Sequence, residues 1–122
     1  MSFNNSEYIK LLNFIDNFTS NAILKPKIVA ISKNHPISAI EEALEHGLRT
    51  FGENRVQEAE KKFYSLKEKY QDIELHLTGP LQSNKIKAAI KIFDIFQTLD
   101  REKIANEFFK NLEPSNNKKF FI

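Results

Sequence analysis

The strongest constraint on the fold is the regular alternation of short apolar runs with amphipathic stretches along the chain. Apolar residues at helical spacing indicate helices. The first run between them, Ile28–Ile31, lacks polar alternation, which is typical of a strand buried on both faces of a parallel sheet. We therefore predict an α/β fold of parallel βα units, wound into a closed barrel or an open doubly wound sheet.

The pattern places every expected element. Apolar stripes predict helices over 8–18, 37–44, 56–70, 86–93 and 104–112. Apolar runs predict strands over 28–31, 48–51, 73–78, 94–99 and 118–122, with a turn at 114–117. Gly47 is placed to end the second helix in the left-handed conformation, and Asp100 to cap the fifth. The 122 residues thus supply four βα units and a fifth strand, one domain or part of one.

The apolar end of the chain predicts an exposed sheet edge. Phe120, Phe121 and Ile122 fall on the fifth predicted strand, with no covering helix after it. Folded proteins normally cover or blunt such an edge. Val29 and Ile31, on the inner face of the first strand, would also lose their covering layer. We expect a chain cut short, which associates with itself through its open edges or packs loosely.

Lys33 follows directly on the first predicted strand. Pro36 suits the first turn of the next helix, with Asn34 or His35 as its cap. Because α/β folds place ligands at the carboxyl ends of strands, Lys33 is a candidate nucleophile that forms an imine after losing its proton by desolvation. The alternative is a solvated loop lysine, in a chain where lysine is abundant.

Composition argues against several classes of function. The chain has no cysteine, which excludes disulfides and thiol catalysis and fits a cytoplasmic location. A net charge of +2 and only three arginines argue against nucleic-acid binding. No apolar run is long enough for a membrane span, and the N-terminus lacks a signal-peptide layout. We predict a soluble cytoplasmic protein without nucleic-acid or membrane partners.

Three sequence blocks together resemble one protein family. They are Ala30–Lys33 followed by Pro36, then Phe51–Glu58, then His76–Lys85. In this order they resemble the pyridoxal phosphate homeostasis protein family, also called the YggS/PROSC type. The likeness extends over roughly residues 8–122 and is more specific than a single motif.

The resemblance implies a fold, a cofactor and a role. Family members are single (β/α)8 barrels of the TIM type, related to the N-terminal domain of alanine racemase. They hold pyridoxal 5'-phosphate (PLP) as a Schiff base on the lysine that falls on Lys33, and hand it over, with PLP-dependent apoenzymes as potential recipients. A complete barrel needs about 200 residues or more, so residues 1–122 would be the N-terminal half of one domain. The loops that grip the phosphate would be missing, which weakens binding.

Two further residues are candidates for cofactor binding. Asn54 lies just past the second strand and can hydrogen-bond substituents of the pyridine ring; the alternative is that it caps the next helix. His76 lies within the third strand; the alternative is a hydrogen-bonded histidine inside the barrel. Glu53 is a candidate to pair with Lys33 or Arg55 and so to tune the lysine; the alternative is a surface ion pair that contributes little.

Three functional hypotheses follow from these residues. The first is a non-catalytic protein of PLP homeostasis. The second is a PLP-dependent enzyme like alanine racemase, which needs a second base, usually a tyrosine. Tyr8, Tyr64 and Tyr70 lie on predicted helices rather than at strand ends, which argues against it. The third is a truncated or split-gene fragment with little function alone.

Overall fold

The computed structural model describes residues 2–19, 26–112 and 117–121. The chain divides into two compact units. One comprises Met1–Ile28 and His35–Leu48, and the other Val29–Asn34 and Arg49–Ile122. None of the helices in the described part of the chain combines the length and the apolar composition that a membrane span requires.

The five predicted helices are all present among the described residues. They are α1 (Asn5–Thr19), α2 (Ile37–Glu45), α3 (Val56–Lys69), α4 (Ile86–Ile92) and α5 (Glu102–Asn111), with a short 3-10 helix η1 (Ser83–Lys85) before α4. Gly47 follows α2 with a φ of 97°, which confirms the left-handed residue predicted there. The predicted caps are wrong: Pro36 and Arg101 are the N-cap residues of α2 and α5, and neither makes a side-chain capping bond.

The first unit contains α1 and α2. The Asn4 side chain accepts a hydrogen bond from the backbone N–H of Glu7 at 3.2 Å, in the first turn of α1. The backbone N–H of Phe3 donates to the Glu42 carboxylate of α2 at 3.3 Å. The Phe3 ring lies 5.6 Å from the ring of His46. These contacts link the start of α1 to α2 within this unit.

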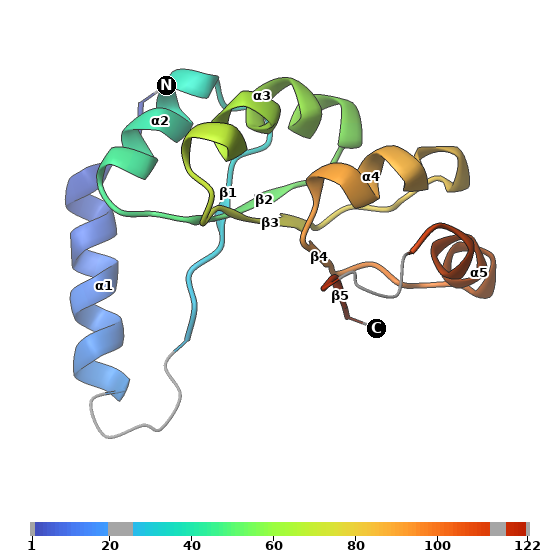
Figure 1. The fold of residues 1–122 in the computed structure, drawn as a ribbon. Helices are drawn as coiled ribbons and strands as arrows, with labels where there is room; N and C mark the ends of the chain where they lie inside the picture. Colours follow the sequence, from blue (N-terminus) through green and yellow to red (C-terminus); the bar gives the residue numbers. More distant parts are fainter. Residues whose placement is uncertain (1, 20–25, 113–116, 122) are drawn as a thin grey trace. The chain divides into compact units, whose positions relative to one another are not determined.

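The second unit is built on a parallel sheet of five strands (Figure 1). The strands are β1 (Ala30–Ile31), β2 (Thr50–Glu53), β3 (Glu74–Leu77), β4 (Ile95–Phe96) and β5 (Lys119–Phe120). They pair in the order β1-β2-β3-β4-β5, and every pair is parallel. The predicted parallel α/β architecture is confirmed, although the strands are shorter than the apolar runs suggested. Of the predicted turn at 114–117, residues 114–116 lie outside the described residues.

The register assigns side chains to two faces of the sheet. Ile31 pairs with Gly52, Gly52 with His76, and His76 with Ile95, so these residues lie on one face, here called the Gly52 face. A Cβ atom added to Gly52 would lie 2.7 Å from Ile31 and 3.4 Å from Val29, which confirms that both side chains point to this face. Ile31 is 48% exposed. The prediction of a strand buried on both faces is therefore wrong at Ile31, whereas the predicted lack of a covering layer over its side chain is confirmed.

The opposite face of the sheet, here called the helix-covered face, carries the core of this unit. Figure 1 shows α3 and α4 on that side of the sheet. The Phe51 ring of β2 lies 5.6 Å from the Phe63 ring of α3. The Phe96 ring of β4 lies 4.8 Å from Phe108 of α5 and 5.2 Å from Phe120 of β5. Aromatic side chains therefore join β2 and β4 to the helices that follow them, and β4 to β5.

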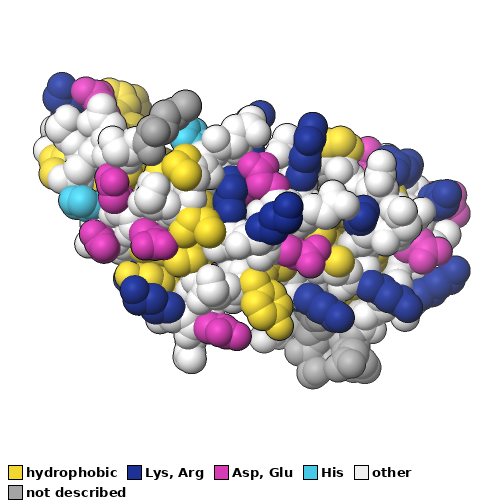
Figure 2. Space-filling view, turned by 90° about the horizontal axis from the view of Figure 1, so that it is seen from above, with side chains coloured by type: hydrophobic (Ala, Val, Ile, Leu, Met, Phe, Trp, Pro, Cys, Tyr) yellow, Lys and Arg dark blue, Asp and Glu magenta, His cyan; other side chains and the backbone are white. Residues whose placement is uncertain are grey.

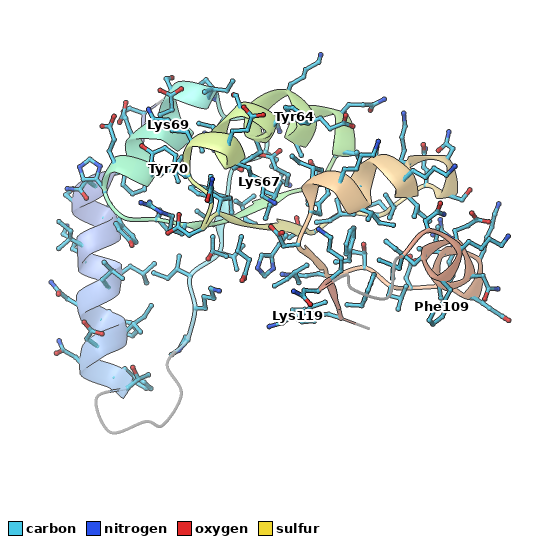
Figure 3. The ribbon with its side chains drawn as sticks, viewed as in Figure 1. Tyr64, Lys67, Lys69, Tyr70, Phe109 and Lys119 are labelled. Atoms are coloured by element: carbon cyan, nitrogen blue, oxygen red, sulfur yellow. The ribbon has the colours of Figure 1, made fainter. Side chains whose placement is uncertain are left out.

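We expect Phe96→Ala to destabilise the chain by about 3–5 kcal/mol, because it deletes the central ring of this cluster and leaves a cavity. Phe96 is 1% exposed. The matched control is Phe109→Ala, since the Phe109 side chain is 78% exposed (Figure 3) and should cost about 0.5 kcal/mol or less. Urea denaturation measures both free energies of unfolding. Equal losses in the two variants would contradict this assignment of the core.

Candidate functional site

The predicted site residues come from three neighbouring strands of the sheet. Lys33 lies two residues after β1, Asn54 directly after β2, and His76 within β3. Parallel strands end at the same edge, and the backbone N–H of Thr78, just past β3, donates to the carbonyl of Glu53 at 2.9 Å. The fold therefore brings these three segments to one region of the sheet, where α/β proteins place their ligands.

Lys33 occupies an exposed turn between β1 and α2. The next residue, Asn34, has a φ of 64°, a left-handed conformation that asparagine tolerates better than most residues. Among the described residues, the Lys33 ammonium has no hydrogen-bond or ion-pair partner. Because Lys33 is exposed, its predicted desolvation is wrong, whereas its predicted place at a strand end is confirmed.

Glu53 does not pair with Lys33 or Arg55, so that prediction is also wrong. Glu53 follows Gly52, and the alternation of side chains along β2 places its carboxylate on the helix-covered face. There it is completely buried and accepts hydrogen bonds from the Ser32 hydroxyl and, at 3.3 Å, from Lys62 Nζ. Burial raises the pKa of Glu53 above its usual value of 4.5.

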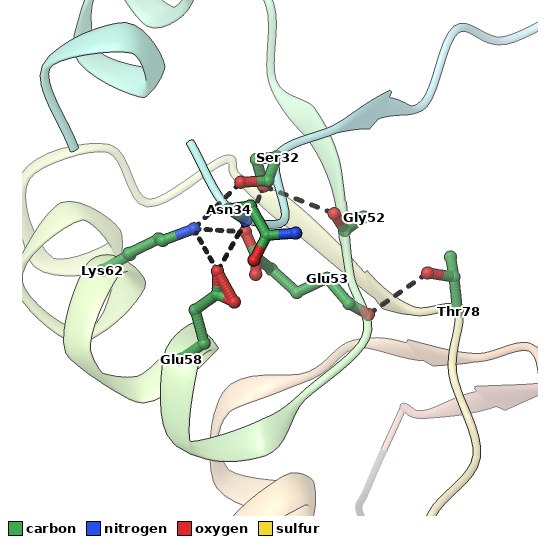
Figure 4. Close-up of polar contacts among 7 residues, drawn as sticks. All are labelled: Ser32, Asn34, Gly52, Glu53, Glu58, Lys62 and Thr78. Carbon is green, nitrogen blue, oxygen red and sulfur yellow. Dashed lines mark hydrogen bonds and ion pairs between the residues drawn. The ribbon is translucent and has the colours of Figure 1, made fainter. Parts of the chain in front are cut away.

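Lys62 of α3 is the centre of this polar cluster (Figure 4). Its ammonium donates to the Ser32 carbonyl at 2.9 Å, to Glu53 Oε2 at 3.3 Å and to Glu58 Oε1 at 2.9 Å. An ammonium has three N–H donors, and each has an acceptor here. Sequence reasoning missed Lys62. The signal that could have found it is Glu53, an acidic residue at a position of β2 that faces the covering helix. A carboxylate buried there needs a cation on that helix.

Glu58 links the same cluster to the turn that carries Lys33. Its Oε1 accepts a hydrogen bond from the backbone N–H of Asn34 at 2.7 Å, as well as the bond from Lys62. These two bonds, Lys62 first, lower the pKa of Glu58 below its usual value of 4.5. Its position one helical turn before Lys62 is the spacing at which a Glu–Lys pair meets on a helix.

Asn54 is half-buried and does not cap α3, because the N-cap residue is Arg55 and makes no side-chain capping bond. Gly79 packs closely behind it: a Cβ atom added to Gly79 would lie 2.7 Å from the Asn54 carbonyl oxygen. Asn54 lines an open cavity of about 580 Å³, together with Arg55, Lys85 and Arg101. Its side-chain amide makes no hydrogen bond among the described residues, which leaves it available to a ligand.

The surface of the molecule carries charges of both signs. On the face drawn in Figure 2, Lys and Arg side chains are interspersed with Asp and Glu. Arg101 itself donates to the Leu81 carbonyl at 3.0 Å and lies 3.4 Å from Asp100. The cations of the cavity are thus partly compensated by the protein.

His76 is buried on the Gly52 face, and both ring nitrogens are engaged. The Gln97 side-chain amide donates to Nδ1 at 2.8 Å, so Nε2 is left to donate to Glu74 Oε1, also at 2.8 Å. This matches the alternative of a hydrogen-bonded interior histidine. A role for His76 in cofactor binding stays a prediction.

No family model matches this chain, but proteins of known sequence do. It is 49% identical over 96 residues to the pyridoxal phosphate homeostasis protein of Buchnera aphidicola subsp. Acyrthosiphon pisum, which covers 75% of this chain and 48% of the relative. It is 46% identical over 79 residues to the protein of that name in Escherichia coli K12, covering 64% of this chain and 34% of the relative. The chain is a homologue of the pyridoxal phosphate homeostasis proteins.

Solved structures show the same relationship. PipY of Synechococcus elongatus, solved with PLP bound, is 41% identical and superposes with a TM-score of 0.66. The match covers 77% of this chain and 45% of PipY. An unknown protein from Bifidobacterium adolescentis superposes with a TM-score of 0.67 at 27% identity, covering 83% of this chain and 46% of that protein. This chain therefore spans about half or less of the relatives it matches.

We expect Glu58→Gln to lower the stability by about 1 kcal/mol at neutral pH, because the charged hydrogen bonds to Lys62 and Asn34 are weakened. Since the pKa of Glu58 is lower in the folded chain, its contribution is present above pH 4.5 and is lost as the pH falls through the folded-state value.

The measurement is urea denaturation of the wild type and the variant over a pH series, with Glu60→Gln on the exposed side of α3 as the control. The difference for Glu58→Gln should shrink below pH 4.5, while Glu60→Gln should stay close to the wild type throughout. A difference that is independent of pH would contradict the assigned ionisation of Glu58.

Proposed function

We propose that this chain binds PLP as a Schiff base on Lys33 and serves PLP homeostasis inside the cell rather than catalysis. The observation that carries the proposal is the 41% identity to PipY, a protein solved with PLP bound. The exposed Lys33 amine, beside the carboxyl edge of a parallel sheet, is consistent with it. PLP-dependent apoenzymes are the proposed recipients of the cofactor.

The residues present fit the reactive part of the cofactor. PLP supplies an aldehyde, and condensation with a lysine amine replaces its C=O by C=N and releases one water. Lys33 offers an amine that no other described residue engages. Asn54 offers an amide without a partner among the described residues, which can hydrogen-bond a substituent of the pyridine ring, and His76 offers a fixed imidazole on the Gly52 face. We propose Lys33, Asn54 and His76 as the cofactor-binding residues.

We also propose that the sheet is part of a (β/α)8 barrel, with all 122 residues in one domain. The support is the strand order, which runs β1 to β5 without reversal. A doubly wound sheet reverses its strand order, whereas a barrel does not. The half-exposed Ile31 on the Gly52 face is what an open barrel interior would show. Self-association through β1 and β5, the outer strands of the described sheet, remains part of this proposal.

Borohydride reduction after incubation with PLP, followed by peptide mapping, tests the Schiff base. We expect the label on Lys33, its loss in Lys33→Ala, and its retention in Lys61→Ala, a control at another exposed lysine. A label that is spread over many lysines and is undiminished in Lys33→Ala would contradict the assignment of Lys33 as the Schiff-base residue.

We predict no turnover of alanine at rates typical of enzymes, on the order of 1 s⁻¹ or above. Racemisation needs a second base opposite the lysine, and the tyrosines are placed elsewhere. Tyr8 lies in α1, Tyr64 is exposed on α3, and Tyr70 directly follows α3, with Arg49 stacked 5.0 Å from its ring (Figure 3). A racemisation assay with added PLP checks this, and sustained turnover would favour the racemase-like alternative.

A further inference from the structure

The two peptide groups on either side of the Lys33 Cα are each held by a side chain of α3. The carbonyl of Ser32, before Lys33, accepts a hydrogen bond from Lys62 Nζ at 2.9 Å. The N–H of Asn34, after Lys33, donates to Glu58 Oε1 at 2.7 Å. Because the planes of these two peptide groups define the φ and ψ angles of Lys33, the two bonds together fix its backbone conformation.

The two side chains that hold the turn are joined to each other and to the sheet. Lys62 Nζ lies 2.9 Å from Glu58 Oε1, a spacing of one helical turn. Lys62 Nζ also lies 3.3 Å from Glu53 Oε2 of β2, and both of these side chains are 10% exposed or less. The Lys62–Glu58 pair, here called the clamp, is therefore attached to a buried residue of the sheet. Its hydrogen bonds to Ser32 and Asn34 hold the turn in a fixed position on that sheet.

The turn needs such support because of its own conformation. Asn34 has a φ of 64°, a left-handed conformation that residues other than glycine adopt rarely. The Lys33 side chain makes no bond among the described residues, so only the backbone directs its amine. A clamp on that backbone is consequently the device through which the structure can orient Lys33.

We propose that Lys62 and Glu58 are positioning residues, which hold the Lys33 turn so that its amine is presented to the PLP aldehyde; this inference rests on the proposed function. Fixing the backbone of one residue raises the population of its bound conformation about tenfold. Here that conformation is the one in which Lys33 presents its amine to the PLP aldehyde. Releasing the clamp should therefore raise the PLP concentration needed for half-maximal labelling of Lys33 about tenfold.

Amide hydrogen exchange on the chain without PLP tests the clamp independently of cofactor binding. In Glu58→Ala the Asn34 amide should exchange about tenfold faster or more, while the Ser32 amide, bonded to the Gly52 carbonyl at 2.9 Å, should keep its protection. Glu60→Ala, on the exposed side of α3, is the matched control. An Asn34 amide that is unprotected in the wild type, or unaffected by Glu58→Ala, overturns the clamp.

Labelling of Lys33 by PLP and borohydride then tests the positioning role in the same variants. We expect a tenfold weaker response in Glu58→Ala and substantial rescue in Glu58→Gln, whose amide oxygen can still accept from Asn34. Equal labelling of Lys33 in the wild type and Glu58→Ala, despite a freely exchanging Asn34 amide, overturns the proposal. Label spread over surface lysines in the wild type overturns the proposed function and the positioning role with it.

Lys62→Met probes the other half of the clamp, with Lys61→Met as its control. Removing Lys62 alone leaves the buried Glu53 carboxylate without a cation, which can unfold the chain. The double variant Glu53→Gln/Lys62→Met removes both charges and avoids that problem. It should label Lys33 about tenfold less readily than the wild type while remaining folded, and wild-type labelling in this variant contradicts the role of Lys62.

Discussion

The buried ion pair between Glu53 and Lys62 is the interaction on which the site depends. Glu53 is completely buried at the end of β2, and Lys62 lies above it on α3 with 10% of its side chain exposed. Taking one partner away would leave an uncompensated charge in the core, at a cost of about 3–5 kcal/mol. The pair therefore fixes α3 on the sheet, and through Ser32 and Glu58 it also fixes the turn that carries Lys33.

The sequence was sufficient for the order of the elements. Apolar stripes located α1 to α5, and the runs between them located β1 to β5, because burial against a sheet imposes these periods on the chain. The predicted N-cap residues were wrong, because a sequence pattern locates the first residue of a helix only to within one or two positions. The local backbone angles decide which residue it is. Asn54 was thus a plausible cap, yet Arg55 holds that position.

The contacts around Lys33 could not be predicted in the same way. Strand alternation beside Gly52 could have placed Glu53 on the helix-covered face, but it does not say which cation of α3 lies above it. That depends on how α3 is rotated on the sheet, and hence on the packing of Phe63 against Phe51. The exposure of Ile31 likewise depends on what lies over the Gly52 face, which the strand pattern leaves open.

The similarity to pyridoxal phosphate homeostasis proteins supports the proposed PLP binding. The clamp is the proposed means by which Lys62 and Glu58 hold the Lys33 turn. An exposed lysine amine is common and unselective, whereas one whose flanking peptide groups are both held has a defined direction. The chain matches about half or less of its relatives' length, so the PLP binding of the whole relatives comes to it as a proposal.

An NMR titration with PLP, which follows the Lys33 side chain and the Asn34 amide together, tests the central claim most directly. We expect a new resonance for a Schiff-base nitrogen at Lys33, with the Asn34 amide still hydrogen-bonded to Glu58 at saturation. Gradual shifts shared among many surface lysines, or an Asn34 amide that exchanges freely before and after PLP is added, would contradict it.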